Sequence, residues 1–264
     1  MNNKVFFEYL QSALFDGELS NSQMVGIQRY LDYWRDKHPT KPVTWLAYIL
    51  SIFFHETKHA MQPMREWGSD AYLRYIYDIE CSPDRASQLG NIKPGDGVTF
   101  AGRGDFKLTG RKNYVYQSEK HDLDLMANPD LMLDPTVSAR VSIEGILDGD
   151  FTGVGLSTYT GGNVFKPSLA DFNVVDACRV ISNSTHIEGF VNHYQKFLIA
   201  IDLAQETITQ TEHQPLEQAL FSSPTTVLDK LPNSEEWLVK ENAISLPSRK
   251  RSSFERFFYH FILK

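Results

Sequence analysis

Hydrophobic residues recur at helical spacing along most of the first 200 positions, and this pattern predicts a mainly helical protein. A short amphipathic helix is expected over residues 4–15. Ser20 followed by Gln23 is the pattern of a capping box, which predicts that a second helix begins there. Residues 44–61 are largely apolar on every face, so a third helix should lie buried at the centre. Pro63 should end it, because proline lacks an N–H group.

The pattern changes in the middle of the chain and then returns. Residues 88–110 contain six glycines and predict loops around one or two short strands. A helical pattern resumes near residue 112, and Asp134 with Pro135 should start another helix. Two more helices are expected within residues 168–183 and 186–204.

Helical periodicity fails after about Ala204, where the chain becomes polar and proline-containing. We therefore expect one helical domain over residues 1–204 and a C-terminal arm or linker over residues 205–264. The last part of that arm, residues 249–264, places a basic cluster before an aromatic face. It should form an amphipathic helix that either docks on the body or contacts a membrane surface or a partner.

Composition narrows the function classes. The chain has 264 residues, of which 42% are hydrophobic, and this is enough for a substantial core. Its net charge of −7 argues against a nucleic-acid partner, because such proteins neutralise phosphates with a basic surface. Cys81 and Cys178 are too few and too far apart for a disulfide framework. The first 20 residues lack the features of a signal peptide, so we expect synthesis in the cytoplasm without an evident export signal.

The stretch from His55 to His59 reads HETKH, which matches the HExxH pattern of zinc proteases. Histidines four apart on a helix share a face and could bind one Zn²⁺, with Glu56 activating the bound water. A third ligand would then come from Glu66 or Glu80. In the alternative interpretation, both histidines are structural and position their neighbours.

The same stretch also offers two carboxylates, Glu56 and Glu66, separated by Pro63. Inverting hydrolysis of a glycoside needs one protonated carboxylic acid and one carboxylate base on either side of the sugar. Glu56 follows an aromatic, apolar helix, where desolvation would favour its neutral form and suit the acid role. The break at Pro63 allows the second carboxylate to turn across a cleft. We favour this interpretation over the zinc site.

Several motifs in order resemble glycoside hydrolase family 19, and most closely its phage-type lysozymes and endolysins. They are HET with MQP, LGN with GDG, GRGDFKLTGRKNY, NPDL with DPTVSAR, and DF with CRVI. The resemblance covers roughly residues 12–200 and includes the specific GRG and LTGR block. It implies a mainly α-helical, lysozyme-like, two-lobed domain with a small β element and a central cleft. The implied chemistry is cleavage of β-1,4 bonds between amino sugars, with inversion and with no metal or other cofactor.

The resemblance also implies roles for individual residues. Glu56 matches the general acid, Glu66 matches the base, and Thr109 matches a hydroxyl residue that helps to hold the attacking water. Arg179 aligns with an arginine whose charge could steady the base. The residues expected to contact the glycan are His55, Trp67, Lys107, Asn113, Tyr114, Arg179 and Asn183.

This chain departs from the family pattern at several positions. In GRGDFKLTG, Asp105 stands where an apolar residue is usual, and Lys107 stands where glutamine is usual. A lysine offers only donors and a positive charge, which could lower the pKa of a nearby carboxyl group. After CRVI the chain has Ser182 and then Asn183, so the usual asparagine is displaced by one position. These changes leave a catalytically weakened, glycan-binding or effector protein as an alternative.

The expected activity is therefore hydrolysis of peptidoglycan, with chitin as the alternative substrate. A binding-only protein and an HExxH metalloprotease are the alternatives from other classes. A cell-wall substrate together with no evident export signal suggests release during phage lysis or injection by a secretion machine. If the protein is an injected toxin, an immunity protein would be a further partner.

Overall fold

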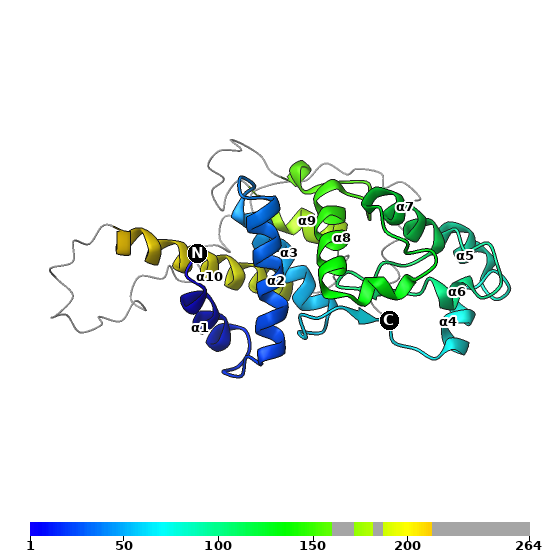
Figure 1. The fold of residues 1–264 in the computed structure, drawn as a ribbon, viewed down its shortest axis with the longest axis horizontal. Helices are drawn as coiled ribbons and strands as arrows, with labels where there is room; N and C mark the ends of the chain where they lie inside the picture. The colour runs from blue at the N-terminus through cyan, green and yellow to red at the C-terminus, as the bar shows by residue number, and fades with distance from the viewer. Residues whose placement is uncertain (160–171, 182–186, 213–264) are drawn as a thin grey trace.

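The computed structural model describes residues 1–159, 172–181 and 187–212. Within these residues the protein is mainly helical, as the periodicity predicted, and the helices form an elongated body (Figure 1). The α-helices are α1 (Asn3–Ala13), α2 (Asn21–Lys37), α3 (Val43–Glu56), α4 (Asp70–Tyr77), α5 (Pro83–Leu89), α6 (Asp96–Thr99), α7 (Arg111–His121), α8 (Pro135–Asp148), α9 (Val174–Ile181) and α10 (Ile187–Glu212). The shorter elements are the 3-10 helices η1 (Pro129–Leu133) and η2 (Leu156–Tyr159) and the strands β1 (Met64–Arg65) and β2 (Arg103–Gly104).

Local capping explains where α2 and α8 begin. The Ser20 hydroxyl accepts from the Gln23 N–H group, and the Gln23 side chain accepts from the Ser20 N–H group, so the predicted capping box is confirmed. Asp134 accepts from the N–H groups of the second and third residues of α8, and Pro135 occupies its first position. Both starts satisfy N–H groups that a helix leaves without internal partners.

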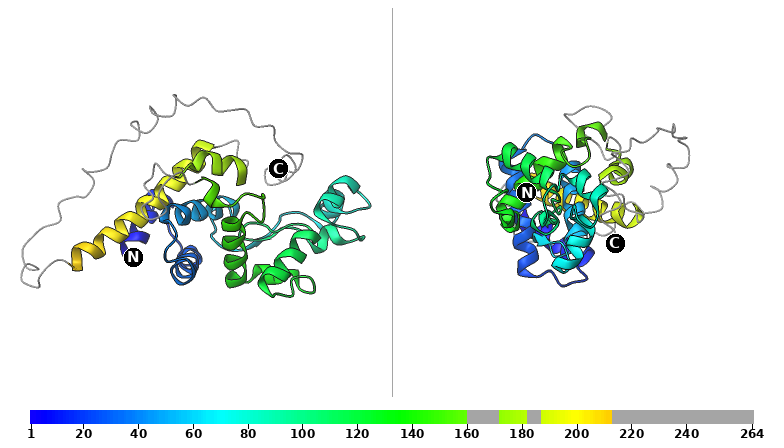
Figure 2. Two further views of the ribbon diagram at one scale, coloured as in Figure 1. Left: turned by 90° about the horizontal axis from the view of Figure 1, so that it is seen from above. Right: turned by 90° about the vertical axis from the view of Figure 1, so that its right-hand side faces the viewer.

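The third helix is the centre of the core, as its composition predicted. Every residue of α3 is buried except Val43 and His55. The long helix α10 packs along α3 and also contacts α1 (Figure 2). The chain start is held against α10, because the Asn2 N–H group donates to the Ala204 carbonyl (2.9 Å).

The predicted end of this helix is wrong: α3 stops at Glu56 rather than continuing to Met61. The Thr57 hydroxyl donates to the Phe53 carbonyl (2.6 Å) and accepts from the Met61 N–H group (2.9 Å), which closes a turn at this point. The turn contains three non-glycine residues with positive φ, namely Lys58 (49°), His59 (69°) and Met61 (54°). The side chain of Thr57, rather than Pro63, therefore marks the end of the helix.

A two-stranded antiparallel ladder joins β1 to β2, with Met64 opposite Gly104 and Arg65 opposite Arg103. The short strand expected among the glycines is β2, whereas its partner β1 carried no sequence signal. The ladder continues in one further contact, since the Glu66 N–H group donates to the Gly102 carbonyl (2.7 Å). It therefore brings Glu66 to the GRG motif.

The apolar interior has two parts. The larger is built on α3 and includes side chains from α1, α2, α8 and α10. The smaller consists of Leu73, Tyr77 and Ala101, with partly buried side chains of α4, α5 and α6 around it. These three helices lie together at one end of the body in Figure 1. Glu66 and Gly102 lie on the chain segments that lead into the smaller cluster.

The last described helix crosses the expected domain boundary. Helix α10 continues past Ala204 to Glu212, so a division at 204/205 falls inside a helix. The predicted amphipathic helix at residues 249–264 lies outside the described residues. Among the helices that the structure describes, none combines the length and the apolar character that a membrane crossing requires.

Candidate active site

Glu56 is the last residue of α3 and is only 2% exposed. Its Oε2 accepts from the Lys107 ammonium at 3.3 Å. Its Oε1 is buried and has no hydrogen-bond partner among the described residues. Burial raises the pKa of Glu56, and the nearby Lys107 charge opposes this shift without cancelling it. The balance favours a carboxylic acid that retains its proton to a higher pH than an exposed glutamate does.

Glu66 lies directly after β1, in a different environment. Its Oε1 accepts from the Tyr77 hydroxyl (2.5 Å), and its Oε2 accepts from the Gly102 N–H group (3.1 Å). Both oxygens of this half-buried carboxylate are therefore acceptors. Such contacts hold the side chain in one orientation and suit a group that acts as a base.

The segment from Gly102 to Thr109 connects the two carboxylates. A Cβ atom on Gly102 would lie 2.9 Å from Oε2 of Glu66 and 3.1 Å from Oγ1 of Thr109, so both side chains flank this glycine. The Thr109 hydroxyl donates to the Lys107 carbonyl (2.8 Å), and Lys107 in turn contacts Glu56. Contacts at Gly102 and Lys107 thus link the three residues predicted to be catalytic, and their catalytic roles remain predictions.

The other residues predicted to contact the glycan differ in their exposure and in the partners of their side chains. Trp67 is 87% exposed and directly follows Glu66, so its ring is available to a ligand. The Asn113 amide donates to the Thr109 carbonyl (2.7 Å) and so holds the loop, and its predicted glycan contact remains a prediction. His55 is half-buried, and its ring lies 6.0 Å from that of Phe190.

Tyr114 requires a correction, because the sequence placed it among the sugar contacts. Its side chain is fully buried, and its hydroxyl donates to the Ala101 carbonyl (3.1 Å). Its ring packs against Phe100, with the ring centroids 5.3 Å apart. Tyr114 therefore supports the loop from inside and offers no surface to a ligand.

Two predicted contacts are not described at the side-chain level. The main chain of Arg179 belongs to α9, but its side chain lies outside the described part of the structure. Asn183 lies wholly outside it, as does Ser182. Their predicted roles remain predictions.

The zinc interpretation depends on His55 and His59 sharing a helical face, and the fold removes that condition. Since α3 ends at Glu56, His59 lies in the following turn with positive φ. Its ring stacks on Phe54, with centroids 4.0 Å apart and planes 5° apart. Within residues 1–159 and the two later described segments, no group of three or more His, Cys, Asp or Glu side chains is arranged to hold a metal.

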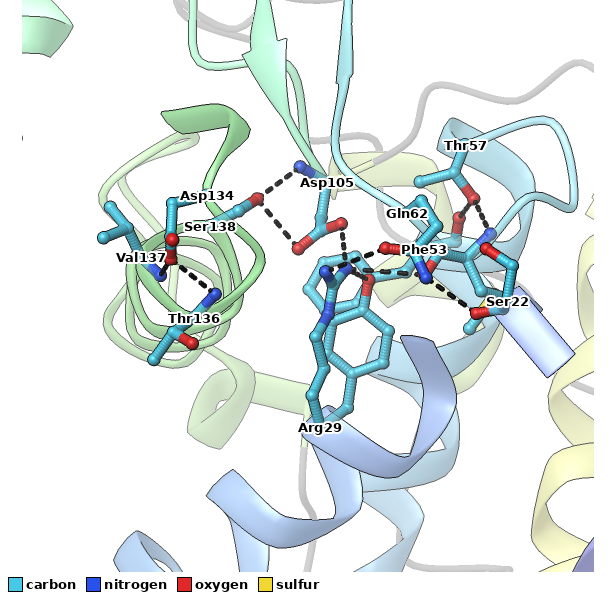
Figure 3. Close-up of polar contacts among 12 residues, drawn as sticks. Ser22, Arg29, Phe53, Thr57, Gln62, Asp105, Asp134, Thr136, Val137 and Ser138 are labelled. Carbon is cyan, nitrogen blue, oxygen red and sulfur yellow. Dashed lines mark hydrogen bonds and ion pairs between the residues drawn. The ribbon is translucent and has the colours of Figure 1, made fainter. Parts of the chain in front are cut away.

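Asp105, which stood in an apolar position of the motif, has a partner that the sequence did not reveal. Its Oδ1 accepts from the Arg29 guanidinium (2.5 Å), and its Oδ2 accepts from the Ser138 hydroxyl (2.8 Å). The Asp105 N–H group also donates to the Ser138 hydroxyl oxygen (2.8 Å), as Figure 3 shows. Burial raises the pKa of Asp105, and the Arg29 charge opposes this shift. The pair ties the loop that carries Lys107 and Thr109 to α2 and α8.

Tyr77 is the second residue whose role the sequence did not reveal. Tyr77 is buried, whereas Tyr72 and Tyr75 of the same helix are exposed. Its hydroxyl contacts Glu66, and the Arg85 guanidinium lies 5.1 Å from its ring centroid. Burial is the largest cause of its raised pKa, so Tyr77 remains a hydrogen-bond donor at any working pH.

Comparison with known proteins gives a limited result. No protein-family model and no curated protein matches the chain. Among the solved structures that resemble it are crystal structures of chitinase C from Streptomyces griseus and of a mutant of chitinase C, at 17% and 16% identity. Each similarity covers 77% of this chain and 76% of the other, with a TM-score of 0.45. A likeness of this size does not assign the chain to a family.

Proposed function

We propose that this protein is a glycosidase that hydrolyses β-1,4 bonds between amino sugars in peptidoglycan. The observation that supports this most strongly is the pairing of two carboxylates in opposite environments through one short loop. Glu56 is buried with a raised pKa, whereas both oxygens of Glu66 accept hydrogen bonds. Glycosidases use one carboxylic acid that keeps its proton and a second carboxylate that acts as the base, so a buried Glu56 beside a hydrogen-bonded Glu66 fits this division of roles.

The proposed reaction uses each residue at a defined atom. Glu56 donates its proton to the glycosidic oxygen as the bond from that oxygen to the anomeric carbon breaks. Glu66 accepts a proton from the water whose oxygen forms the new bond to the same carbon. The Thr109 hydroxyl donates its own proton to the Lys107 carbonyl, so its lone pairs can accept from that water. Proton exchange with solvent then restores Glu56 and Glu66 to their starting forms.

The proposal also includes a sugar contact for Trp67 and a way for the protein to reach its substrate. The exposed Trp67 ring next to Glu66 would pack on a sugar face. The substrate lies outside the cytoplasm, so the protein would reach it after phage lysis or through a dedicated secretion machine. Chitin shares the β-1,4-linked N-acetylglucosamine unit and would fit the same residues.

Binding without turnover is the second candidate, and one observation favours it. The Lys107 ammonium contacts Glu56, and a cation at this position stabilises the ionised form, which cannot act as the acid. In that case the protein would bind glycans through the same surface and release no product.

Digestion of purified peptidoglycan and of chitin oligosaccharides, followed by mass spectrometry, tests the proposal. The wild-type protein should release new reducing sugars, and their identity reports which bond is cut. Glu56→Gln and Glu66→Gln should each slow release by about 10²–10⁴-fold. Glu119→Gln changes an exposed glutamate of α7 and should leave the rate unchanged. Absence of new reducing sugars from both glycans, or full activity in Glu56→Gln, would overturn the proposal.

A further inference from the structure

Lys107 contacts Glu56 through its side chain and Thr109 through its main chain. Its ammonium lies 3.3 Å from Oε2 of Glu56, and its main-chain carbonyl accepts from the Thr109 hydroxyl. The residue has positive φ (51°), so the chain reverses here and turns the side chain and the carbonyl to different neighbours. Glutamine, which the resembling family usually has at this position, could not supply the charge.

The neighbours of Lys107 hold it in this place. Asp105 is fixed by Arg29 and Ser138, and the Phe106 ring packs against Phe151 with centroids 4.8 Å apart. On the other side, Leu108 exchanges two main-chain hydrogen bonds with Arg103. A loop anchored on both sides of one residue keeps its ammonium beside Glu56 instead of letting it extend into solvent.

The charge on Lys107 acts on Glu56 at close range. At the same end of the fold, burial first and then the neighbouring His59 and His55 lower the pKa of His193. The Lys107 charge opposes the effect of burial on the pKa of Glu56. The Lys107 side chain is itself mostly buried, so water screens the pair only partly.

We propose that Lys107 is a positioning residue that controls the protonation of Glu56 and thereby sets the upper pH limit of hydrolysis. This inference rests on the proposed function. By stabilising the carboxylate left after proton transfer, the ammonium makes Glu56 a stronger acid. It also confines activity to lower pH, because Glu56 then loses its proton sooner as the pH rises.

The test measures the protonation of Glu56 directly and separately from activity. The protein is labelled with ¹³C at glutamate carboxyl groups, and the Glu56 signal is assigned by its loss in Glu56→Gln. Its titration is then compared in the wild type, Lys107→Gln, Lys107→Met and Lys107→Arg. Lys120→Gln is the matched control, because the two lysine side chains are similarly exposed (22% and 23%) and Lys120 pairs with Asp148 and Asp150.

Removing the charge should raise the Glu56 titration midpoint by about 1–3 pH units in Lys107→Gln and Lys107→Met. The basic limb of the kcat/KM profile on the glycan should move upward by the same amount, because this limb reports the acid in the free enzyme. Lys107→Arg and Lys120→Gln should leave both quantities unchanged.

Two results would overturn the inference: an unchanged Glu56 midpoint in both neutral variants, or a shifted midpoint with an unmoved basic limb. Folding of each variant is checked by circular dichroism, and either neutral variant suffices alone. Absence of hydrolysis by the wild-type protein would instead count against the proposed function, and the titration would still show whether Lys107 controls Glu56.

Discussion

Replacing Arg29 by methionine should destabilise the protein strongly, because it leaves a buried charge without its partner. Asp105 has no exposed side-chain surface, and the Arg29 side chain is only 13% exposed. The substitution keeps most of the apolar stem of Arg29 and removes the cation that lies 2.5 Å from Oδ1 of Asp105.

The size of this stability loss follows from the contacts that Asp105 keeps and loses in the variant. Asp105 keeps its hydrogen bonds from Ser138 and Tyr30, but its Oδ1 loses the contact with the Arg29 charge. Breaking a buried ion pair from one side costs about 3–5 kcal/mol in the free energy of unfolding. Because burial already raises the pKa of Asp105, the isolated carboxyl group should protonate as the pH falls. The loss should therefore be smaller at pH 5 than at pH 8.

Urea denaturation followed by circular dichroism measures this loss. The double variant Arg29→Met with Asp105→Leu removes both charges and should recover most of the stability, because replacing a buried pair by apolar groups is often neutral or better. Arg35→Met is the control, since its pairs with Asp32 and Asp36 are exposed and the stability should barely change. A loss below about 1 kcal/mol for Arg29→Met would refute the reasoning, because that is the range of an exposed pair. A double variant no more stable than Arg29→Met would show that the unpaired Asp105 charge is not the cause.

Three further predictions concern the site and its surroundings. Tyr77→Phe removes the donor to Oε1 of Glu66 and should lower kcat by about tenfold, the equivalent of one hydrogen bond to a charged group. Steady-state kinetics measures this effect, provided that the variant has the same Tm as the wild type. An unchanged kcat would contradict the prediction. Above pH 5, Glu56→Gln should unfold at a higher urea concentration than the wild type. Burial raises the pKa of Glu56 in the folded state, so the wild type loses stability as the pH rises past the unfolded pKa of about 4.3. A variant less stable than the wild type at pH 8 would contradict this prediction. Burial and neighbouring positive groups lower the pKa of His193 to about 4. The free energy of unfolding of the wild type should therefore fall by about 1–2 kcal/mol between about pH 6.5 and about pH 4, after allowance for solvent screening. His193→Gln should flatten this dependence in a plot of Tm against pH, and an equally steep plot would exclude His193 as its source.

The elements that sequence alone predicted are those controlled by local chemistry. The capping box at Ser20 and the Asp134–Pro135 start each involve residues within a few positions, so the pattern contains the whole interaction. The buried character of α3 follows in the same way from its apolar composition. The motifs placed Glu56, Lys107 and Thr109 in one predicted site; the structure shows that Lys107 contacts the other two, and their function remains a prediction.

The features that sequence did not reveal depend on contacts between distant segments. The ladder between β1 and β2, the Tyr77 contact to Glu66 and the Arg29–Asp105 pair each join separate parts of the chain. One signal could have revealed the last of these: a charge in an otherwise apolar motif needs a buried partner of opposite sign. The end of α3 was missed for a different reason, because Thr57 closes the turn with its side chain before Pro63 is reached.

The central claim is that Glu56 and Glu66 cleave a β-1,4 glycoside as acid and base, with water as the nucleophile. Proton NMR of the sugar product in the first minutes of hydrolysis, before the anomers equilibrate, tests it most directly. The account predicts that the α anomer appears first, that EDTA does not slow its formation, and that Glu56→Gln slows it by about 10²–10⁴-fold. Initial release of the β anomer, or hydrolysis that stops with EDTA, would contradict it.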